Sequence, residues 1–189
     1  MTKHTKAKLT KMALTSSQQI LLDKAYECFT RWKDFDTNLR DEMHSRGANF
    51  PSVVSEIIAC AAFGLSWPIV TAGDAKDLSK NVVYEIKATS AKGNDLSSFS
   101  PNEKFDDLLF CKYDRGKEVV YIYDTKKSRD DMKEYVVNKK KNETFESQAL
   151  SGRRPRMSIE SKIINKEKLK PSYEAHFSKD DGIVVYKSR

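Results

Sequence analysis

Glu85 and Lys87 are two charged residues inside the apolar stretch NVVYEIKATS, residues 81–90. Side chains alternate along a β-strand, so these two project from the same face, about 7 Å apart. Asp74 lies upstream of Glu85, at the end of a preceding strand candidate. If the two segments pair, the carboxylates converge on one point. Two such carboxylates suit Mg²⁺, and a lysine beside them stabilises negative charge on a phosphate.

The alternative for Glu85 and Lys87 is a salt-bridged pair on an exposed sheet face, which contributes little to stability. The spacing acid-x-Lys occurs five times in the chain, but only this pair lies inside an apolar strand with an acid just upstream. The pattern alone therefore leaves both interpretations open.

Glu56 is a third candidate carboxylate, because it is the only charged residue between Val53 and Leu65. That segment is apolar on all sides and is expected to form a buried helix. A buried carboxylate needs a partner or a cation. The alternative is a half-exposed glutamate near the helix start, where the helix dipole favours negative charge.

The composition favours a polyanionic partner, with nucleic acid first. The chain has 189 residues and a formal charge of +7. Three cysteines without CxxC spacing and three scattered histidines argue against a disulfide framework, a zinc site or a histidine nucleophile. The sequence has no Walker loop, no signal-peptide pattern and no apolar run of about 18 residues. We therefore expect a cytoplasmic protein without a membrane segment or a nucleotide cofactor.

The order of the expected elements indicates an α/β fold with a mixed central sheet flanked by helices. Residues 1–15 are expected to be a basic flexible tail, and 16–189 a single domain. Helical periodicity predicts a long N-terminal helix over about 17–46, with a possible break near Asp34, and a second helix over 51–64 that ends at Gly64. The remaining expected elements are strands near 69–72 and over 81–89, a hairpin of 106–114 and 117–124, a polar helix over 127–141, and a last strand over 182–187.

Asp74, ten intervening residues and then Glu85-Ile86-Lys87 resemble the signature of the PD-(D/E)XK nucleases. The segments RGANFPSVVSEIIACAAFG, AGDAKDL, YEIKATS, DLSSFSP, FDDLLF, YIYD and SGRRPRMSI resemble, in order and spacing, the small type II restriction endonucleases that cut GCNGC-type sites. The likeness covers about residues 46–160, the expected nuclease core. One departure is Gly73, which stands where the family name puts proline.

The resemblance implies Mg²⁺-dependent, sequence-specific hydrolysis of double-stranded DNA, with Mn²⁺ as a possible substitute for Mg²⁺. It implies that Asp74 and Glu85 are metal ligands and that Lys87 is the catalytic lysine. Glu56 carries over as the helix glutamate that some members add to the metal site.

The segment SGRRPRMS is the first candidate for reading DNA, because arginine is the commonest reader of guanine. Pro155 disfavours helix at the preceding residue, so the segment is expected to be extended. Base readout and phosphate contact are both open for each arginine. The complete set of candidate DNA-binding residues is Arg153, Arg154, Arg156, Lys92, Asn94, Asp95, Ser97, Ser98, Arg46 and Asn49.

A palindromic site would imply a homodimer, since a twofold axis in the DNA is matched by one in the protein. The long helix, with Trp32 and Phe35, is a candidate dimer surface, and ordinary core packing is the alternative. The sequence is also compatible with two other functions. One is a structure-selective nuclease of the same fold, such as a resolvase or a repair nickase. The other is a non-catalytic basic DNA-binding protein.

Overall fold

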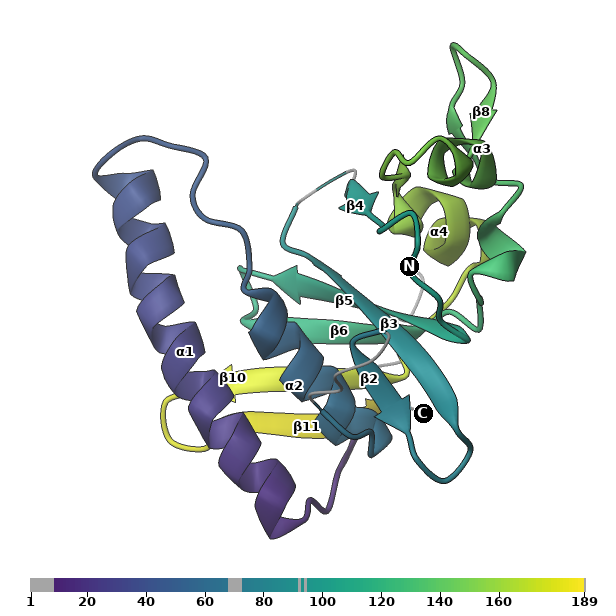
Figure 1. The fold of residues 1–189 in the computed structure, drawn as a ribbon. Helices are drawn as coiled ribbons and strands as arrows, with labels where there is room; N and C mark the ends of the chain where they lie inside the picture. The colour runs from purple at the N-terminus through teal and green to yellow at the C-terminus, as the bar shows by residue number, and fades with distance from the viewer. Residues whose placement is uncertain (1–8, 68–72, 92, 94, 189) are drawn as a thin grey trace, which may run out of the picture.

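A seven-stranded mixed sheet forms the centre of the computed structural model, which describes residues 9–67, 73–91, 93 and 95–188 (Figure 1). Only the β3–β5 pair is parallel among the neighbouring strands of this sheet as described, and the other pairs are antiparallel. The strands, in spatial order, are β1 (Leu9–Lys11), β11 (Gly182–Ser188), β10 (Tyr173–Ser178), β6 (Val119–Asp124), β5 (Asp107–Asp114), β3 (Val82–Thr89) and β2 (Ala75–Asp77).

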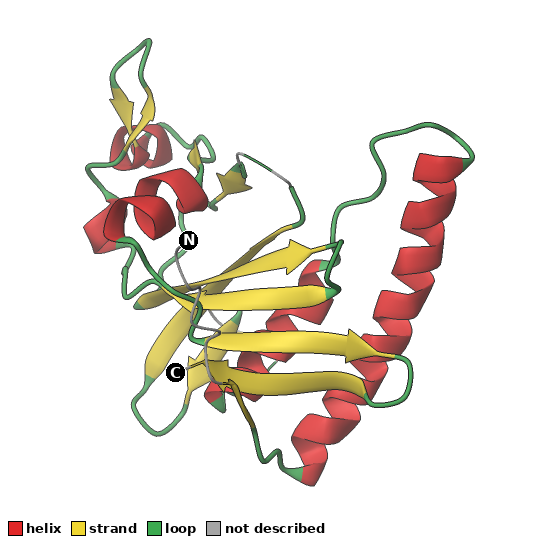
Figure 2. Cartoon of the chain, turned by 180° about the vertical axis from the view of Figure 1, so that it is seen from behind, coloured by secondary structure: helices red, strands yellow, loops and turns green. Residues whose placement is uncertain are grey.

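Two helices, α1 (Ser16–Asp41) and α2 (Ser52–Phe63), lie side by side over one face of this sheet (Figures 1 and 2). A capping box between Thr15 and Gln18 starts α1, and Gly64 ends α2 in the left-handed conformation. Helix α1 is continuous through Asp34, where the sequence left a break open. The core on this face brings together apolar side chains of both helices and of β3, β5, β6, β10 and β11.

A smaller group of elements, from residues 97 to 167, packs on the opposite face of the sheet (Figure 1). It includes β4 (Ser97–Ser98), a 3₁₀ turn η1 (Asp130–Met132), β7 (Val136–Asn138), β8 (Glu143–Thr144), α3 (Phe145–Leu150), β9 (Arg156–Met157), a π-helical turn η2 (Glu160–Ile164) and α4 (Asn165–Glu167). A second core cluster, with Phe99, Phe110 and Phe145 at its centre, holds these elements on the sheet.

The expectation of a polar helix over 127–141 was wrong. The segment forms η1, and then β7, which pairs with β8. Two features explain the difference from a helix. Met132 is fully buried and packs in the second core cluster. Val136 and Val137 are β-branched and therefore favour a strand.

The chain ends also differ from expectation. Residues 9–11, expected in the flexible tail, form β1 and pair with β11, and Met12 and Leu14 pack against the core. The polar strand β10 was not expected. The strand expected near 69–72 lies outside the described residues, as does the start of the tail. No helix in the described part of the chain is long and apolar enough to cross a membrane.

Asp107, at the start of β5, makes folding stability depend on pH. Burial, together with the nearby Asp124 carboxylate, raises its pKa from 3.8 to about 6. The folded chain therefore binds more protons than the unfolded chain between about pH 4 and pH 6, so this group lowers the free energy of unfolding as pH rises through that window.

Asp107→Asn should therefore stabilise the chain at pH 7, by no more than about 3 kcal/mol, and have little effect below pH 4. The asparagine keeps an oxygen for the Leu108 N–H, which donates to Asp107 at 2.8 Å. Urea unfolding at a series of pH values measures the effect. The exposed Asp180→Asn is the control, and an equal change in both variants at every pH would contradict the assignment.

Candidate active site

The pairing of β2 with β3 brings Asp74 against Glu85. The Asp74 N–H donates to the carbonyl oxygen of Tyr84 at 2.8 Å, and its Oδ2 accepts from the Ile86 N–H at 2.7 Å. Asp74 thus bonds to the residues on both sides of Glu85, as the expected pairing of neighbouring segments requires. Burial raises the pKa of Asp74, while the hydrogen bond from Ile86 and the charge of Lys87 oppose the rise.

Glu85 is a fully buried carboxylate beside Lys87. Its Oε1 accepts a hydrogen bond from Lys87 Nζ, whereas its Oε2 is buried and has no hydrogen-bond partner among the described residues. Lys87 is 21% exposed, and its ammonium lies 5.4 Å from the centre of the Phe99 ring. An unpartnered buried carboxylate oxygen is costly, so it fits a cation bound at this point.

Glu56 lies near these groups and has a partner of its own. Its Oε2 accepts from the indole N–H of Trp67 at 3.0 Å. Its charge, like that of Glu103, acts on Asp74 and raises the pKa of that carboxyl. Glu103, in the segment before β5, was missed because nothing in its local sequence distinguishes it from a surface glutamate.

The described residues do not place three histidine, cysteine, aspartate or glutamate side chains in a ready-made metal cluster. Two adjacent carboxylates still match the chemistry of Mg²⁺, which keeps several waters and takes further oxygens from a substrate phosphate. Asp74 and Glu85 therefore fit such an ion, with Glu56 as a neighbour held by Trp67.

Gly73 occupies the position where the resemblance leads one to expect proline. Its φ is +67°, and a Cβ there would lie 2.5 Å from Val83 Cγ1 and 2.8 Å from the Tyr84 carbonyl oxygen. Proline fixes φ near −65°, so it is excluded by the backbone, and any side chain is excluded by contact with β3. Glycine therefore allows Asp74 to approach Glu85.

Gly73→Ala should lower the rate of DNA cleavage at least about 10-fold, because displacing a catalytic group by about 1 Å can cost as much as 100-fold. Gly64→Ala is the matched control: its φ is +68°, but a Cβ there meets nothing within 4 Å. Both variants carry similar backbone strain, so equal cleavage rates in single-turnover assays would show that the close approach at Gly73 is unimportant.

The candidate DNA-binding residues fall into different environments. Arg153 is held in a two-pronged ion pair by Glu143, at 2.9 and 3.3 Å, and this pair lowers the pKa of Glu143 to about 2. Arg154 and Arg156 are exposed and make no ion pair with a described residue. Lys92 and Asn94 lie outside the described residues.

Asp95 was expected to contact DNA, and its burial does not fit that expectation. It is 2% exposed and accepts hydrogen bonds from Ser97 Oγ, Ser158 Oγ and the N–H groups of Ile159 and Glu160. These bonds fix the segment before β4 to the turn that follows β9. Ser98 is half-buried in β4, where it pairs with Arg156.

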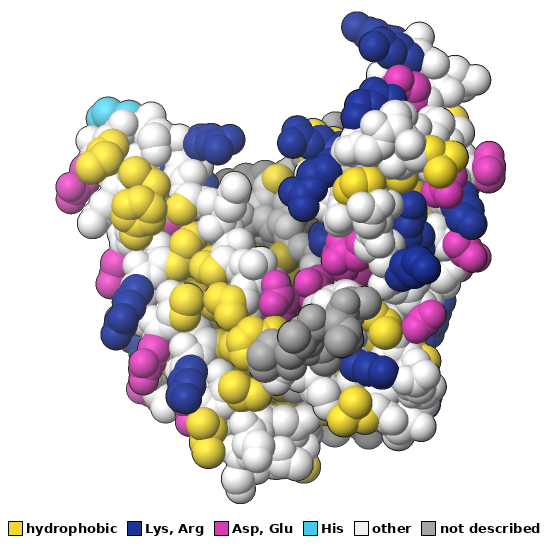
Figure 3. Space-filling view, viewed as in Figure 1, with side chains coloured by type: hydrophobic (Ala, Val, Ile, Leu, Met, Phe, Trp, Pro, Cys, Tyr) yellow, Lys and Arg dark blue, Asp and Glu magenta, His cyan; other side chains and the backbone are white. Residues whose placement is uncertain are grey.

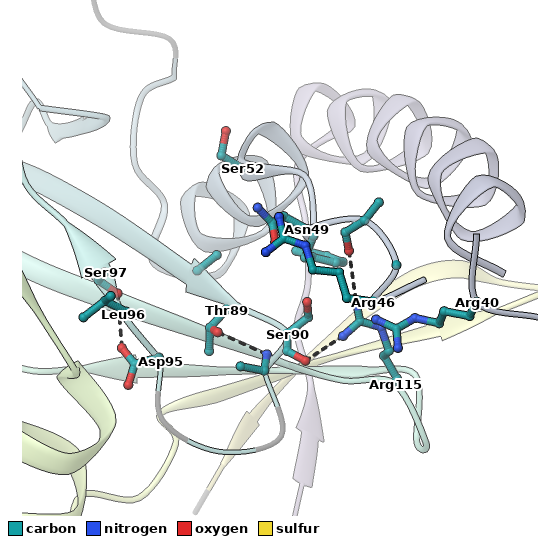
Figure 4. A pocket seen from close by; sticks show the side chains of 15 residues that line it. Arg40, Arg46, Asn49, Ser52, Thr89, Ser90, Asp95, Leu96, Ser97 and Arg115 are labelled. Atoms are coloured by element: carbon teal, nitrogen blue, oxygen red, sulfur yellow. Dashed lines mark hydrogen bonds between the residues drawn. The ribbon is translucent and has the colours of Figure 1, made fainter. Parts of the chain in front are cut away.

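A cavity of about 810 Å³ opens at the carboxyl end of β3, just beyond Lys87 (Figure 4). Its lining includes Arg46 and Asn49 of the loop between α1 and α2, Ser90 at the strand end, and Ser97. Figure 3 shows lysine and arginine side chains on both sides of the hollow between the two parts of the molecule, with acidic side chains toward its floor. This arrangement suits a polyanion whose phosphate approaches the carboxylates.

Residues 18–166 match a family model described as Bsp6I restriction endonuclease. The chain is also 37% identical over 149 residues to the type II restriction enzyme Bsp6I of Bacillus sp. (strain RFL6), an alignment that covers 79% of this chain and 84% of that enzyme. These matches show that the chain is a restriction endonuclease. Double-stranded DNA is the substrate of that class. More particularly, it belongs to the Bsp6I restriction endonuclease family, and its function is that of a type II restriction endonuclease.

Proposed function

We propose that the chain hydrolyses phosphodiester bonds of double-stranded DNA in a Mg²⁺-dependent reaction, with a PD-(D/E)XK active site built from Asp74, Glu85 and Lys87. The observation that carries the proposal is the fully buried Glu85 carboxylate, whose Oε2 has no hydrogen-bond partner in the described part of the chain while Asp74 lies beside it. Type II restriction enzymes generally need a divalent metal, and the sequence signature from Asp74 to Lys87 agrees with this site.

Each side chain has a separate task in this proposal. Asp74 and Glu85 hold Mg²⁺, or Mn²⁺ in its place, and Glu56 adds a nearby negative charge. The ion supplies positive charge that polarises the scissile phosphate and lowers the pKa of a bound water. Lys87 stabilises the charge that develops on the phosphate. Its ion pair with Glu85 keeps its ammonium at the site.

The proposed recognition sequence is a short palindrome of the GCNGC type, which the sequence resemblance supports. Arg154 and Arg156 are exposed and make no ion pair with a described residue, and they are the candidates for contacting guanine or phosphate. Arg153, because Glu143 holds it, is assigned to fixing that segment. The symmetry of such a site implies a homodimer.

Helix α1 is the proposed dimer surface, through its exposed apolar side chains. Phe35 is 56% exposed and Ile20 is 55% exposed, and Met43, just beyond the end of the helix, is 68% exposed. Trp32, in contrast, packs against Phe50 with ring centres 5.2 Å apart, so it belongs to the core. Sedimentation with and without DNA tests the assembly: a monomer on a duplex that is cut in both strands would contradict it.

Digestion of a plasmid of known sequence, with and without Mg²⁺, tests the proposed function. Discrete Mg²⁺-dependent fragments, with ends that map to one short sequence, are the expected result. Nicked circles or fragments without common ends would indicate a structure-selective nuclease instead. Intact DNA in both conditions, with a mobility shift on gels, would overturn the proposal.

A further inference from the structure

The loop between α1 and α2, residues 45–50, is anchored by a buried carboxylate. Asp36 is 5% exposed, and its oxygens accept from the Ala48 N–H at 2.6 Å and from the Nε atoms of Arg40 and Arg115, both at 3.1 Å. Burial acts to raise the pKa of Asp36, but these hydrogen bonds outweigh it and lower the pKa. Asp36 is therefore ionised at neutral pH and tied to the loop.

Arg115 connects this loop to the strand that carries Glu85 and Lys87. Its Nη2 donates to the Ala48 carbonyl oxygen at 3.0 Å, and its Nη1 donates to the Ser90 carbonyl oxygen at 2.6 Å (Figure 4). The guanidinium also lies 5.5 Å from the centre of the Trp32 ring. One arginine thus fixes the loop relative to the end of β3.

Gly47 lets the loop wrap closely around the anchor. Its φ is +79°, and a Cβ there would lie 2.3 Å from Arg40 Nε and 2.4 Å from Asp36 Oδ1. On either side of this tight contact, Arg46 and Asn49 are exposed and line the cavity. Within the described residues, neither side chain makes a hydrogen bond or an ion pair.

The cavity therefore holds two kinds of polar side chain. Arg40 and Arg115 are committed to Asp36. Arg46 and Asn49 are uncommitted donors on a fixed backbone, and Figure 4 shows Arg46 extended toward Asn49 over the end of β3. Rigid support of free hydrogen-bonding groups is the arrangement that precise recognition requires.

We propose that this cavity is a base-reading site for double-stranded DNA, in which Arg46 and Asn49 contact base edges in the major groove while Arg115 and Asp36 position their loop. The proposal rests on the proposed function and adds the residues that read the sequence. Arginine pairs with O6 and N7 of guanine through two hydrogen bonds, and asparagine presents both a donor and an acceptor to a base edge.

The position of the cavity relative to the active site agrees with this assignment. Thr89 lines the cavity two residues after Lys87 on the same strand. That step spans about 6.6 Å, which corresponds to about two base-pair steps of roughly 3.4 Å each. The cavity thus begins within about two base-pair steps of the phosphate at Glu85 and Lys87, as a short recognition sequence demands.

Discrimination between sequences is the quantity to measure. Single-turnover cleavage rates are compared on a duplex that carries the mapped site and on duplexes with one base pair changed, for the wild type, Arg46→Ala, Asn49→Ala and the control Arg31→Ala. Arg31 is an exposed arginine of α1 outside the cavity. Arg46→Ala should lower the ratio of the two rates about 10- to 100-fold, and Arg31→Ala should leave it unchanged.

Unchanged ratios in both cavity variants would overturn the base-reading assignment while the proposed function stands. Equal loss on all duplexes by Arg46→Ala would indicate a phosphate contact and would also overturn it. If the wild type cuts all duplexes alike, the proposed function itself fails. Melting temperatures confirm that each variant is folded, which is expected because Arg46 and Asn49 are exposed.

The positioning role of Arg115 is tested by combining variants. If Arg115 acts through Arg46 and Asn49, adding Arg115→Ala to the double variant Arg46→Ala/Asn49→Ala should not lower the ratio further. Asp36→Asn keeps the shape of the anchor but removes its charge, and it should lower the ratio in the same way as Arg115→Ala. Additive losses of discrimination would overturn the positioning role.

Discussion

Lys87→Ala should lower the single-turnover rate of DNA cleavage at least about 100-fold while the folded protein still binds its recognition sequence. Removing one preorganised group that stabilises developing charge typically costs 100- to 1,000-fold, and Lys87 also neutralises Glu85 in the resting protein. The measurement pairs cleavage rates in Mg²⁺ with duplex binding on gels without metal.

The control for this prediction is Lys133→Ala. Lys133 has the same acid-x-Lys spacing, after Asp131, but its side chain is 42% exposed and pairs with Asp130 outside the active site. The Lys133→Ala variant should cut DNA at the wild-type rate. Wild-type cleavage by Lys87→Ala would remove the basis for the proposed active site.

Stability gives an independent signature of the same pair. Lys87→Ala leaves the buried Glu85 carboxylate without its partner, so the melting temperature should fall. The double variant Glu85→Gln/Lys87→Ala removes the buried charge as well and should recover part of that loss. If Lys87→Ala melts at the wild-type temperature, the interaction between Glu85 and Lys87 does not contribute to stability.

The strand with Glu85 and Lys87 was predictable because its signal is local. The apolar run of β3, the apolar run of α2 and its stop at Gly64 each follow from neighbours within a few residues. The pairing of the Asp74 segment with β3 was also predictable, because two strands joined by a short connection usually lie next to each other. The role of each residue in catalysis stays a prediction.

Other features were not predictable because they depend on contacts far along the chain. Strand β10 has a polar sequence, and it is a strand because it lies between β6 and β11. Asp95 resembles a polar loop residue until the segment after β9 folds over it, more than 60 positions later. The anchor formed by Asp36 and Arg115 joins residues 79 positions apart, and no short motif marks it.

Glu85→Gln should remove most of the stabilisation that a divalent metal gives to the wild type. An ion at 100 times its dissociation constant stabilises the folded chain by about 2.7 kcal/mol, which corresponds to a rise in melting temperature of about 5–10 °C for a chain of this size. Glutamine keeps the shape of the side chain but loses the charge that attracts the ion. Thermal melts with and without Mg²⁺, in the absence of DNA, measure the difference.

Glu160→Gln is the matched control. Glu160 also pairs with a lysine, Lys112 at 2.5 Å, and its buried Oε2 also has no hydrogen-bond partner within the residues that the structure describes. It belongs to η2 and not to the Asp74 site. It should keep the full metal-dependent rise. An equal rise in Glu85→Gln and the wild type would show that Glu85 is not a ligand. If that variant also fails to cut DNA, Glu85 acts on the substrate or the attacking water, and Asp74 is then the carboxylate that remains to hold the ion.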